Sequence, residues 1–179
     1  MQFTSDHSGR AAGIAALFEA TFTASEGPDE GHLIGDLARN LLETTPQEDL
    51  HVFLALDDND IAGCIIFSRL SYDEDDRTVF VLAPVAVATE RQGMGIGQEL
   101  LKYGLGQIRD EGVDVAVTYG DPAYYGKVGF APITEVEARA PFTLRLPHGW
   151  LGQSLTDRPL EPLKGPSRCV AALDRPEFW

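Results

Sequence analysis

Three glycines stand at alternate positions in the segment RQGMGIG, residues 91–97. The segment follows a long apolar run and precedes a helix-like pattern. At the N-terminus of a helix, free backbone N–H groups and the helix dipole both favour an anionic ligand. Glycines let such a loop curl and let the ligand approach the backbone closely. The segment therefore predicts a phosphate cradle built from backbone groups.

Other interpretations of the glycine segment compete with this one. A Walker loop ends in Gly-Lys-Ser/Thr, whereas Gly97 is followed by Gln98 and Glu99, so that class fails. A Rossmann loop has the spacing G-x-G-x-x-G and opens a longer doubly wound domain than the remaining chain allows. Asp121, in the place of its ribose-binding acid, keeps the Rossmann alternative open. A glycine-rich turn with no ligand is a further alternative.

The apolar run before the loop, TVFVLAPVAVA at residues 78–88, predicts a central strand that is covered on both faces. Pro84 interrupts this run, and proline cannot donate a hydrogen bond to a strand ladder. Because the run is too apolar for an exposed edge, we expect a bulge or splay near Pro84. Backbone groups left there without a strand partner must bond to something else.

Three segments of this chain, in this order and spacing, resemble the GNAT superfamily of N-acetyltransferases. Residues 92–97 resemble its Q/R-x-x-G-x-G/A loop, and residues 85–87 are similar to its bulged strand. Residues 125–130, YGKVGF, resemble its Y-x-K-x-G-F segment. Residues 78–131 carry most of the resemblance, while FTL at 142–144 and the closing PEFW resemble the YhbS-like branch.

The resemblance implies acetyl-CoA as cosubstrate, bound where the bulged strand splays from its parallel neighbour. Val85 and Val87 would offer backbone hydrogen bonds to the pantetheine arm and the thioester, and the loop would cradle the pyrophosphate. Arg91 would either add a cation near the phosphates or remain a solvated loop arginine. The cofactor-binding residues so implied are Val85, Ala86, Val87, Arg91, Gln92, Gly93, Met94, Gly95, Ile96, Gly97 and Gln98.

The implied chemistry is direct acyl transfer in a ternary complex, in which a neutral amine attacks the thioester carbonyl and a thiolate leaves. A tyrosine suits the protonation of the sulfur, because its pKa of roughly 10 is near that of an alkyl thiol. Tyr125 matches the family's usual acid, with Tyr124 as the alternative. Many members carry an asparagine seven residues before this tyrosine, where this chain has Thr118. We interpret Asp121 first as a helix cap, because a carboxylate near the CoA phosphates would be unfavourable.

The general base is left open by the sequence. Four side chains lie on the early helices or their loop, where the family usually binds the acceptor, and any of them could act through water: Glu19, Glu26, Glu30 and His32. Solvated surface charges are the simpler interpretation of each. The histidines show no metal spacing and the two cysteines are far apart, so we predict no metal.

Periodicity places the elements that must position these residues. A strand, the glycine loop, a helix and a second strand imply a βαβ unit, to which an early hairpin adds antiparallel strands. We therefore predict a mixed α/β fold with a central, mostly antiparallel sheet, a splayed parallel pair and flanking helices. Four helices are expected: 8–22, capped by Asp6 or Ser8, then 33–42, a helix ending at Gly112, and a short helix begun by Asp121. The expected strands are 50–57, 61–70, 78–88, 113–120, 142–146 and 167–173. Residues 23–31 and 148–166 are expected to be irregular.

Length and composition predict one domain over residues 1–179, with a core at 1–133 and a tail at 134–179 that completes it. No segment is typical of a membrane span or a signal peptide, so we expect a cytoplasmic protein. Cys64 and Cys169 are expected to be buried thiols, with a disulfide between them as the alternative. The net charge of −14 argues against nucleic-acid binding and suits a cationic substrate or simply an acidic surface.

The sequence supports three hypotheses for function. The leading one is an acetyl-CoA-dependent N-acetyltransferase acting on a primary amine of a small molecule or peptide. The second is a non-catalytic acyl-CoA-binding sensor, and the third is an interaction protein that uses the proline-rich tail with an exposed Trp150. A symmetric homodimer through the tail or an edge strand is the expected oligomer.

Overall fold

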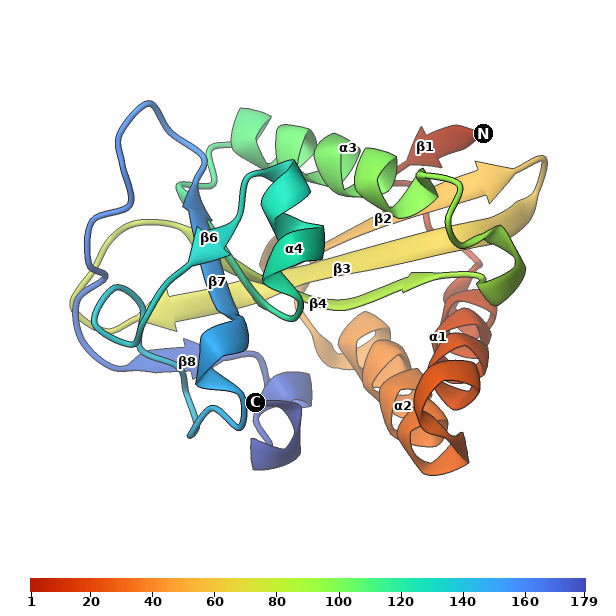
Figure 1. The fold of residues 1–179 in the computed structure, drawn as a ribbon, viewed down its shortest axis with the longest axis horizontal. Helices are drawn as coiled ribbons and strands as arrows, with labels where there is room; N and C mark the ends of the chain where they lie inside the picture. Colours follow the sequence, from red (N-terminus) through yellow and green to blue (C-terminus); the bar gives the residue numbers. More distant parts are fainter. The chain divides into compact units, whose positions relative to one another are not determined.

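The structure is a computed structural model that describes residues 1–179, and it divides into two compact units. The first unit contains Met1–Phe67 and Pro84–Gly104, and the second contains Ser68–Ala83 and Leu105–Trp179. Figure 1 traces the chain through these elements. The helices are α1 (Ala11–Glu26), α2 (Pro28–Thr44), α3 (Ile96–Asp110) and α4 (Pro122–Tyr125). The strands are β1 (Gln2–Thr4), β2 (Leu50–Asp57), β3 (Asp60–Tyr72), β4 (Val79–Val87), β5 (Val115–Tyr119), β6 (Ala131–Pro132), β7 (Trp150–Ser154) and β8 (Ser167–Cys169).

The sheet confirms the predicted mixed α/β class. Its strands hydrogen-bond in the order β1-β2-β3-β4-β5-β7-β6, and β8 pairs with β3. The β1/β2, β3/β8, β5/β7 and β6/β7 pairs are antiparallel, whereas β4 and β5 are parallel. The parallel register runs from Val79↔Val115 to Leu82↔Thr118, while β4 itself continues to Val87. The register therefore ends two residues before Pro84, where the sequence predicts a bulge or splay.

Helices α1 and α2 lie side by side in the first unit (Figure 1) and are joined by Gly27 alone. The prediction of a loop at 23–31 is therefore wrong. Gly27 takes φ 98°, Pro28 occupies the first helical position, and two acidic residues follow in the first turn of α2. These residues favour a helix start as much as a loop, because proline fits the first turn and carboxylates complement the helix dipole.

The cap predicted for α1 is also wrong. The residue at the cap position is Arg10, and no side chain caps the helix. Asp6 instead accepts a hydrogen bond from the backbone N–H of Ser8 at 3.1 Å. The carboxylate is therefore used in a local turn before the helix, which is the competing role of short polar side chains.

Two glycines of α2 allow α1 to approach closely. A Cβ on Gly31 would lie 2.7 Å from the carbonyl oxygen of Glu19, and one on Gly35 would lie 2.9 Å from the Cβ of Glu19. Real Cβ atoms do not come this close, so the two helices would have to separate to admit any side chain at either position.

We therefore expect Gly35→Ala to lower the free energy of unfolding by about 1–3 kcal/mol, because overpacking costs more than the added helix propensity returns. Gly106→Ala in α3 is the matched control, since its Cβ would meet only the Arg109 side chain at 3.9 Å. The control should be neutral or gain up to about 1 kcal/mol. Urea denaturation of both variants measures the difference, and equal midpoints would contradict the close packing.

The C-terminal third of the chain departs from the sequence prediction in the second unit. Residues 142–146 form no strand, and β7 lies instead in the segment 148–166 that was expected to be irregular. The predicted strand 167–173 is confirmed only for Ser167–Cys169, and a 3-10 turn follows. Trp150 is fully buried, and its Nε1–H donates to the carbonyl of Ala138 at 2.8 Å. The expected exposed Trp150 of a partner surface is therefore wrong.

Outside the C-terminal third of the chain, the structure confirms the strands predicted from the apolar pattern. β2 has the predicted bounds, and β4 is buried at every residue from Val79 to Pro84. Cys64 is fully buried and Cys169 half-buried, and both are free thiols. None of the helices combines the length and the apolar character that crossing a bilayer requires.

Candidate functional site

The glycine loop lies in the first unit, between β4 and α3. Gly93 and Gly95 take φ values of 76° and 82°, and a Cβ on either would meet nothing within 4 Å. This left-handed conformation favours glycine, since other residues pay about 1–2 kcal/mol to adopt it. The backbone conformation, and not crowding, therefore requires glycine, and the space beside both residues is open.

The backbone N–H groups beyond the glycines are those of a helix start. Helix α3 begins at Ile96, and Glu99 N–H donates to the Gly95 carbonyl at 3.1 Å. The N–H groups of Ile96, Gly97 and Gln98 precede this bond, so they have no intrahelical acceptor. Met94 is 66% exposed, whereas Ile96 and Gly97 are buried. A curled loop with open space beside it and unpaired donors after it can hold an anion.

Two side chains fix the entry to the loop. Gln92 Nε2 donates to the carbonyl of Val87 at 3.0 Å, which folds the loop back on the end of β4. Arg91 pairs with Asp57 at 2.5 Å, from the end of β2. The charge of the Arg91 guanidinium is therefore partly neutralised by the Asp57 carboxylate. The side chains of Arg91 and Asp57 each remain more than a third exposed.

The strand residues implied as cofactor contacts alternate in burial. Ala86 is 3% exposed, whereas Val85 and Val87 are half-buried. Gly63 on β3 lets the chain approach this strand, because a Cβ there would lie 3.2 Å from the Ala86 carbonyl oxygen. Val85 and Val87 thus lie at the more accessible positions of the strand.

Tyr125 lies in the second unit at the end of α4, with its ring held on several sides. The ring is edge-on to Tyr124 at 5.1 Å and to Phe130 at 5.8 Å. A Cβ on Gly120 would lie 2.7 Å from the ring, so the β5–α4 turn closes directly on it. Burial is the main reason why the pKa of the Tyr125 hydroxyl is raised above its ordinary value, while a hydrogen bond with Thr118 lowers it. At neutral pH the hydroxyl is therefore a proton donor.

Two polar residues close to Tyr125 in sequence, Asp121 and Thr118, have defined hydrogen-bond partners. Asp121 accepts a hydrogen bond from Ala123 N–H at 2.9 Å and caps α4, with Pro122 at the first helical position, as predicted. Thr118 is fully buried, and its hydroxyl donates to the Leu82 carbonyl at 2.8 Å. Thr118 therefore bridges the parallel pair at the last residue of its register.

The structure brings together two of the four candidate bases. Nδ1 of His32 on α2 lies 2.7 Å from Oε1 of Glu19 on α1. Glu26, at the end of α1, is exposed and Glu30, in the first turn of α2, is half-buried. No spacing rule relates residues on different helices, so sequence reasoning did not find the Glu19–His32 pair.

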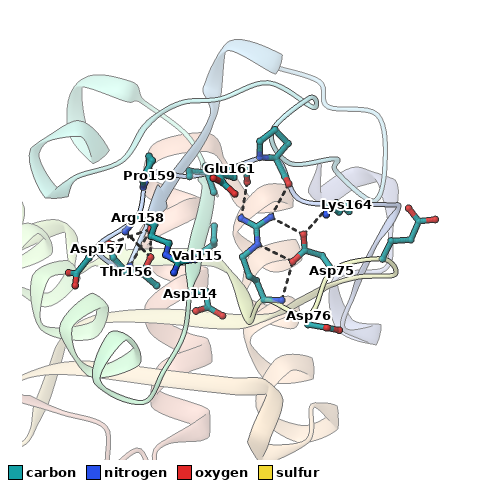
Figure 2. A pocket seen from close by; sticks show the side chains of 15 residues that line it. Asp75, Asp76, Asp114, Val115, Thr156, Asp157, Arg158, Pro159, Glu161 and Lys164 are labelled. Atoms are coloured by element: carbon teal, nitrogen blue, oxygen red, sulfur yellow. Dashed lines mark hydrogen bonds and ion pairs between the residues drawn. The ribbon is translucent and has the colours of Figure 1, made fainter.

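Two concavities of similar volume contain none of the predicted site residues. One, of about 590 Å³, lies in the first unit against α1 and the end of β4. The other, of about 600 Å³, lies in the second unit (Figure 2) and is lined by several charged side chains, among them Asp76, Asp114, Arg158 and Glu161. No group of three or more histidine, cysteine or acidic side chains is arranged to hold a metal.

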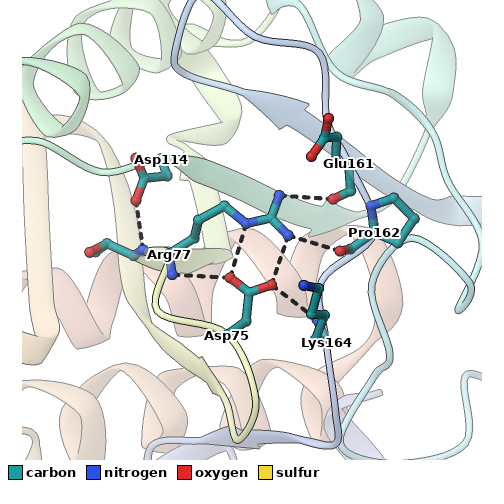
Figure 3. Close-up of polar contacts among 7 residues, drawn as sticks. Asp75, Arg77, Asp114, Glu161, Pro162 and Lys164 are labelled. Carbon is teal, nitrogen blue, oxygen red and sulfur yellow. Dashed lines mark hydrogen bonds and ion pairs between the residues drawn. The ribbon is translucent and has the colours of Figure 1, made fainter.

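A charged clamp borders the second concavity (Figure 3). Arg77 Nε and Nη2 donate to the two oxygens of Asp75 at 3.0 and 2.8 Å. The same guanidinium donates to the carbonyls of Glu161 and Pro162, and the N–H of Lys164 donates to Asp75. Every one of these groups is paired within the chain, so the clamp ties residues 74–77 to residues 161–164 and is structural.

The family model described as Acetyltransferase (GNAT) family matches residues 11–130, which include the glycine loop, the proline-interrupted strand and Tyr125. The chain therefore belongs to this family. It is 33% identical over 140 residues to an uncharacterised N-acetyltransferase of Escherichia coli, YjhQ, covering 75% of this chain and 77% of YjhQ.

Two solved structures share the fold along almost the whole chain. One is YhbS of Escherichia coli in complex with CoA, with a TM-score of 0.78, 25% identity, and coverage of 97% of this chain and 92% of that one. The other is a GNAT family acetyltransferase of Brucella melitensis in complex with acetyl-CoA, with a TM-score of 0.75, 26% identity, and coverage of 97% of both chains. These matches confirm the resemblance to the GNAT superfamily and its YhbS-like branch.

Proposed function

We propose that the protein is an acetyl-CoA-dependent N-acetyltransferase that moves the acetyl group to a primary amine of a small molecule or peptide. One observation carries the proposal: Gly93 and Gly95 hold the loop in a left-handed conformation, with open space beside it, directly before the N-terminus of α3. The CoA and acetyl-CoA complexes of YhbS and of the Brucella melitensis protein support the choice of cosubstrate.

Each predicted residue then has one role. The backbone of residues 92–98 would hold the pyrophosphate, and the backbone of Val85 and Val87 would hydrogen-bond the pantetheine arm and the thioester. Tyr125 would donate its hydroxyl proton to the departing sulfur, as its protonated state at neutral pH allows. The family match draws on segments of both units, which supports one catalytic domain over residues 1–179.

The cradle predicts a ligand-specific thermal shift. Acetyl-CoA at about 100 times its Kd should raise the Tm by about 5–10 °C, because binding only the folded state stabilises it by about 2.7 kcal/mol. Equal concentrations of ATP and NAD should give little or no shift. A shift with NAD in place of acetyl-CoA would mean that the loop holds a dinucleotide and would overturn the proposal.

Gly95→Val tests whether this loop holds the ligand. A β-branched residue at φ 82° is strained, so the loop should change shape and the acetyl-CoA shift should be lost. Gly112→Val is the matched control at the other end of α3, because Gly112 has φ 94° and equally open surroundings. It should lower the Tm by a similar amount and keep the ligand shift. Loss of the shift in both variants would contradict a specific role for the loop.

A second candidate function is an acyl-CoA-binding sensor without catalysis. Thr118, in place of the asparagine of many family members, uses its hydroxyl on the Leu82 carbonyl and is fully buried. The Thr118 hydroxyl is therefore not available to hydrogen-bond a ligand on this side of the cofactor, as the amide of an asparagine would be. This candidate predicts acetyl-CoA binding with no acetylation in a broad screen of primary amines, whereas transfer to any amine would reject it.

A further inference from the structure

The general base is the missing part of the reaction, and the first unit holds a candidate pair for it. We propose that His32 is the general base that takes the proton from the acceptor amine, and that Glu19 is its positioning residue. The inference rests on the proposed acetyltransferase function. It starts from the 2.7 Å contact between His32 Nδ1 and Glu19 Oε1, which joins α2 to α1.

The contact fixes which nitrogen can accept a proton. An ionised carboxylate only accepts hydrogen bonds, so Nδ1 of His32 must carry the hydrogen that it shares with Glu19. In a neutral imidazole the other nitrogen, Nε2, is then the proton acceptor. The side chain of His32 is 66% exposed, so Nε2 is open to an incoming amine and can pass its proton on to solvent. This is the carboxylate–imidazole arrangement by which many hydrolases hold a histidine base.

The backbone around the pair holds it in place. His32 lies one residue after Gly31 and three before Gly35, the two glycines at which α2 comes closest to α1. The Cβ of Glu19 lies only 2.9 Å from where a Cβ on Gly35 would be, so the stem of Glu19 packs closely against the α2 backbone. A base must be held within hydrogen-bond reach of its substrate, and rigid elements hold it better than loops.

Stability does not explain the pair. Both side chains are largely exposed, at 66% for His32 and 40% for Glu19, and exposed ion pairs contribute little to folding. Glu26 and Glu30 make no comparable contact with a second titratable group. Of the four candidates, His32 is thus the one that has an oriented, accessible nitrogen.

The proposed step balances without another reactant. The amine arrives as R–NH3⁺, and His32 Nε2 takes one proton and later releases it to solvent. The neutral nitrogen forms a bond to the thioester carbon, and the carbon–sulfur bond breaks as the amide forms. The nitrogen loses its second proton in this collapse while the sulfur gains one, so one proton is released per turnover.

The test uses the full-length protein with an amine found by screening. His32→Ala should lower kcat about 100-fold, within the usual range for loss of a general base, with the KM for acetyl-CoA unchanged. Added imidazole should restore at least part of the lost turnover, because it can enter the space and accept the proton. Glu19→Gln, which keeps a hydrogen-bond acceptor but no charge, should lower kcat by about 10-fold, as expected of a positioning residue.

Controls separate this inference from the proposed function. His7→Ala removes another histidine, which is half-buried and whose Nδ1 contacts the Ser5 carbonyl at 3.1 Å, and should leave kcat and its imidazole dependence unchanged. A wild-type kcat for His32→Ala, or a loss that imidazole does not restore, would overturn the general-base role alone. A wild-type protein that acetylates no amine would overturn both proposals together.

Discussion

Replacing Tyr125 with phenylalanine is expected to lower kcat by about 100-fold or more while the Kd for acetyl-CoA stays near the wild-type value. The change removes one hydroxyl and keeps the ring, which is held by Tyr124, Phe130 and the close approach of Gly120. The loss is the usual size for a positioned acid. Initial rates at saturating acetyl-CoA, together with a binding isotherm, separate the two quantities.

The raised pKa of Tyr125 makes the expected loss independent of pH over the neutral range. Burial disfavours the phenolate, so the hydroxyl stays protonated well above pH 7 and remains a donor. Turnover of the wild type should therefore show no decline from ionisation of Tyr125 below about pH 10, the ordinary pKa of the group. If wild-type turnover instead declines as the pH rises below about pH 10, and Tyr125→Phe shows no such decline, the hydroxyl does not stay protonated as expected.

Tyr124→Phe is the matched control, because Tyr124 is adjacent in the chain and its ring lies edge-on to that of Tyr125. It should keep most of the wild-type kcat. If Tyr124→Phe loses turnover and Tyr125→Phe does not, the acid is the neighbouring tyrosine, which the sequence alone left as the alternative. If neither variant loses turnover, the proton reaches the sulfur by another route and the proposed role of tyrosine is wrong.

The part of the site that the sequence predicts is the part built from short, continuous segments. The glycine loop, the interrupted strand and the cap at Asp121 each depend on the local conformation of a few residues. Glycine at positive φ, proline in a strand and aspartate at a helix start all act within one turn. Such features are visible in the residue types themselves, and the structure places them where they were expected.

The parts that were missed depend on contacts between distant segments. β7 and the burial of Trp150 result from pairing with β5, which residues 148–166 do not encode in their own periodicity. The Glu19–His32 pair results from the close packing of α1 and α2, which only the glycines at 31 and 35 make possible. The misplaced loop at 23–31 shows the same limit, because a proline such as Pro28 can either start a helix or end one, and its neighbours in space decide between the two.

The Asp75–Arg77 clamp carries a large expected effect on stability. Asp75 is only 7% exposed, and Arg77 directs four of its guanidinium N–H groups to Asp75, Glu161 and Pro162 (Figure 3). Arg77→Ala leaves that carboxylate without its cation and two carbonyls without their donor. The Arg77 side chain is itself 29% exposed, so the pair is partly buried, and the loss of its charged hydrogen bonds should cost about 1–3 kcal/mol. The variant should therefore unfold at a lower urea concentration.

The matched control is a neighbouring ion pair in the same unit. Arg168 pairs with Asp73 at 3.0 Å, but its side chain is 75% exposed. Arg168→Ala should therefore change the free energy of unfolding by less than about 1 kcal/mol. Similar losses in the two variants would mean that burial of the Asp75–Arg77 pair adds nothing and would contradict the structural role of the clamp.

The same clamp predicts a pH dependence with a defined sign. The hydrogen bonds from the Arg77 side chain hold the pKa of Asp75 well below its usual range, and the backbone N–H groups of Arg77 and Lys164 add to this. A carboxylate with a lowered folded-state pKa stabilises the protein above its unfolded value of about 3.9, and the stabilisation is lost as the pH falls through the folded-state pKa. Wild-type Tm should therefore fall steeply below pH 4, and Asp75→Asn should have a lower Tm at pH 7 with a shallower fall in acid. The Tm of both proteins is measured between pH 2 and 7. If the two curves run parallel, Asp75 has the same pKa in the folded and unfolded chains, and the proposed cause of the acid sensitivity is wrong.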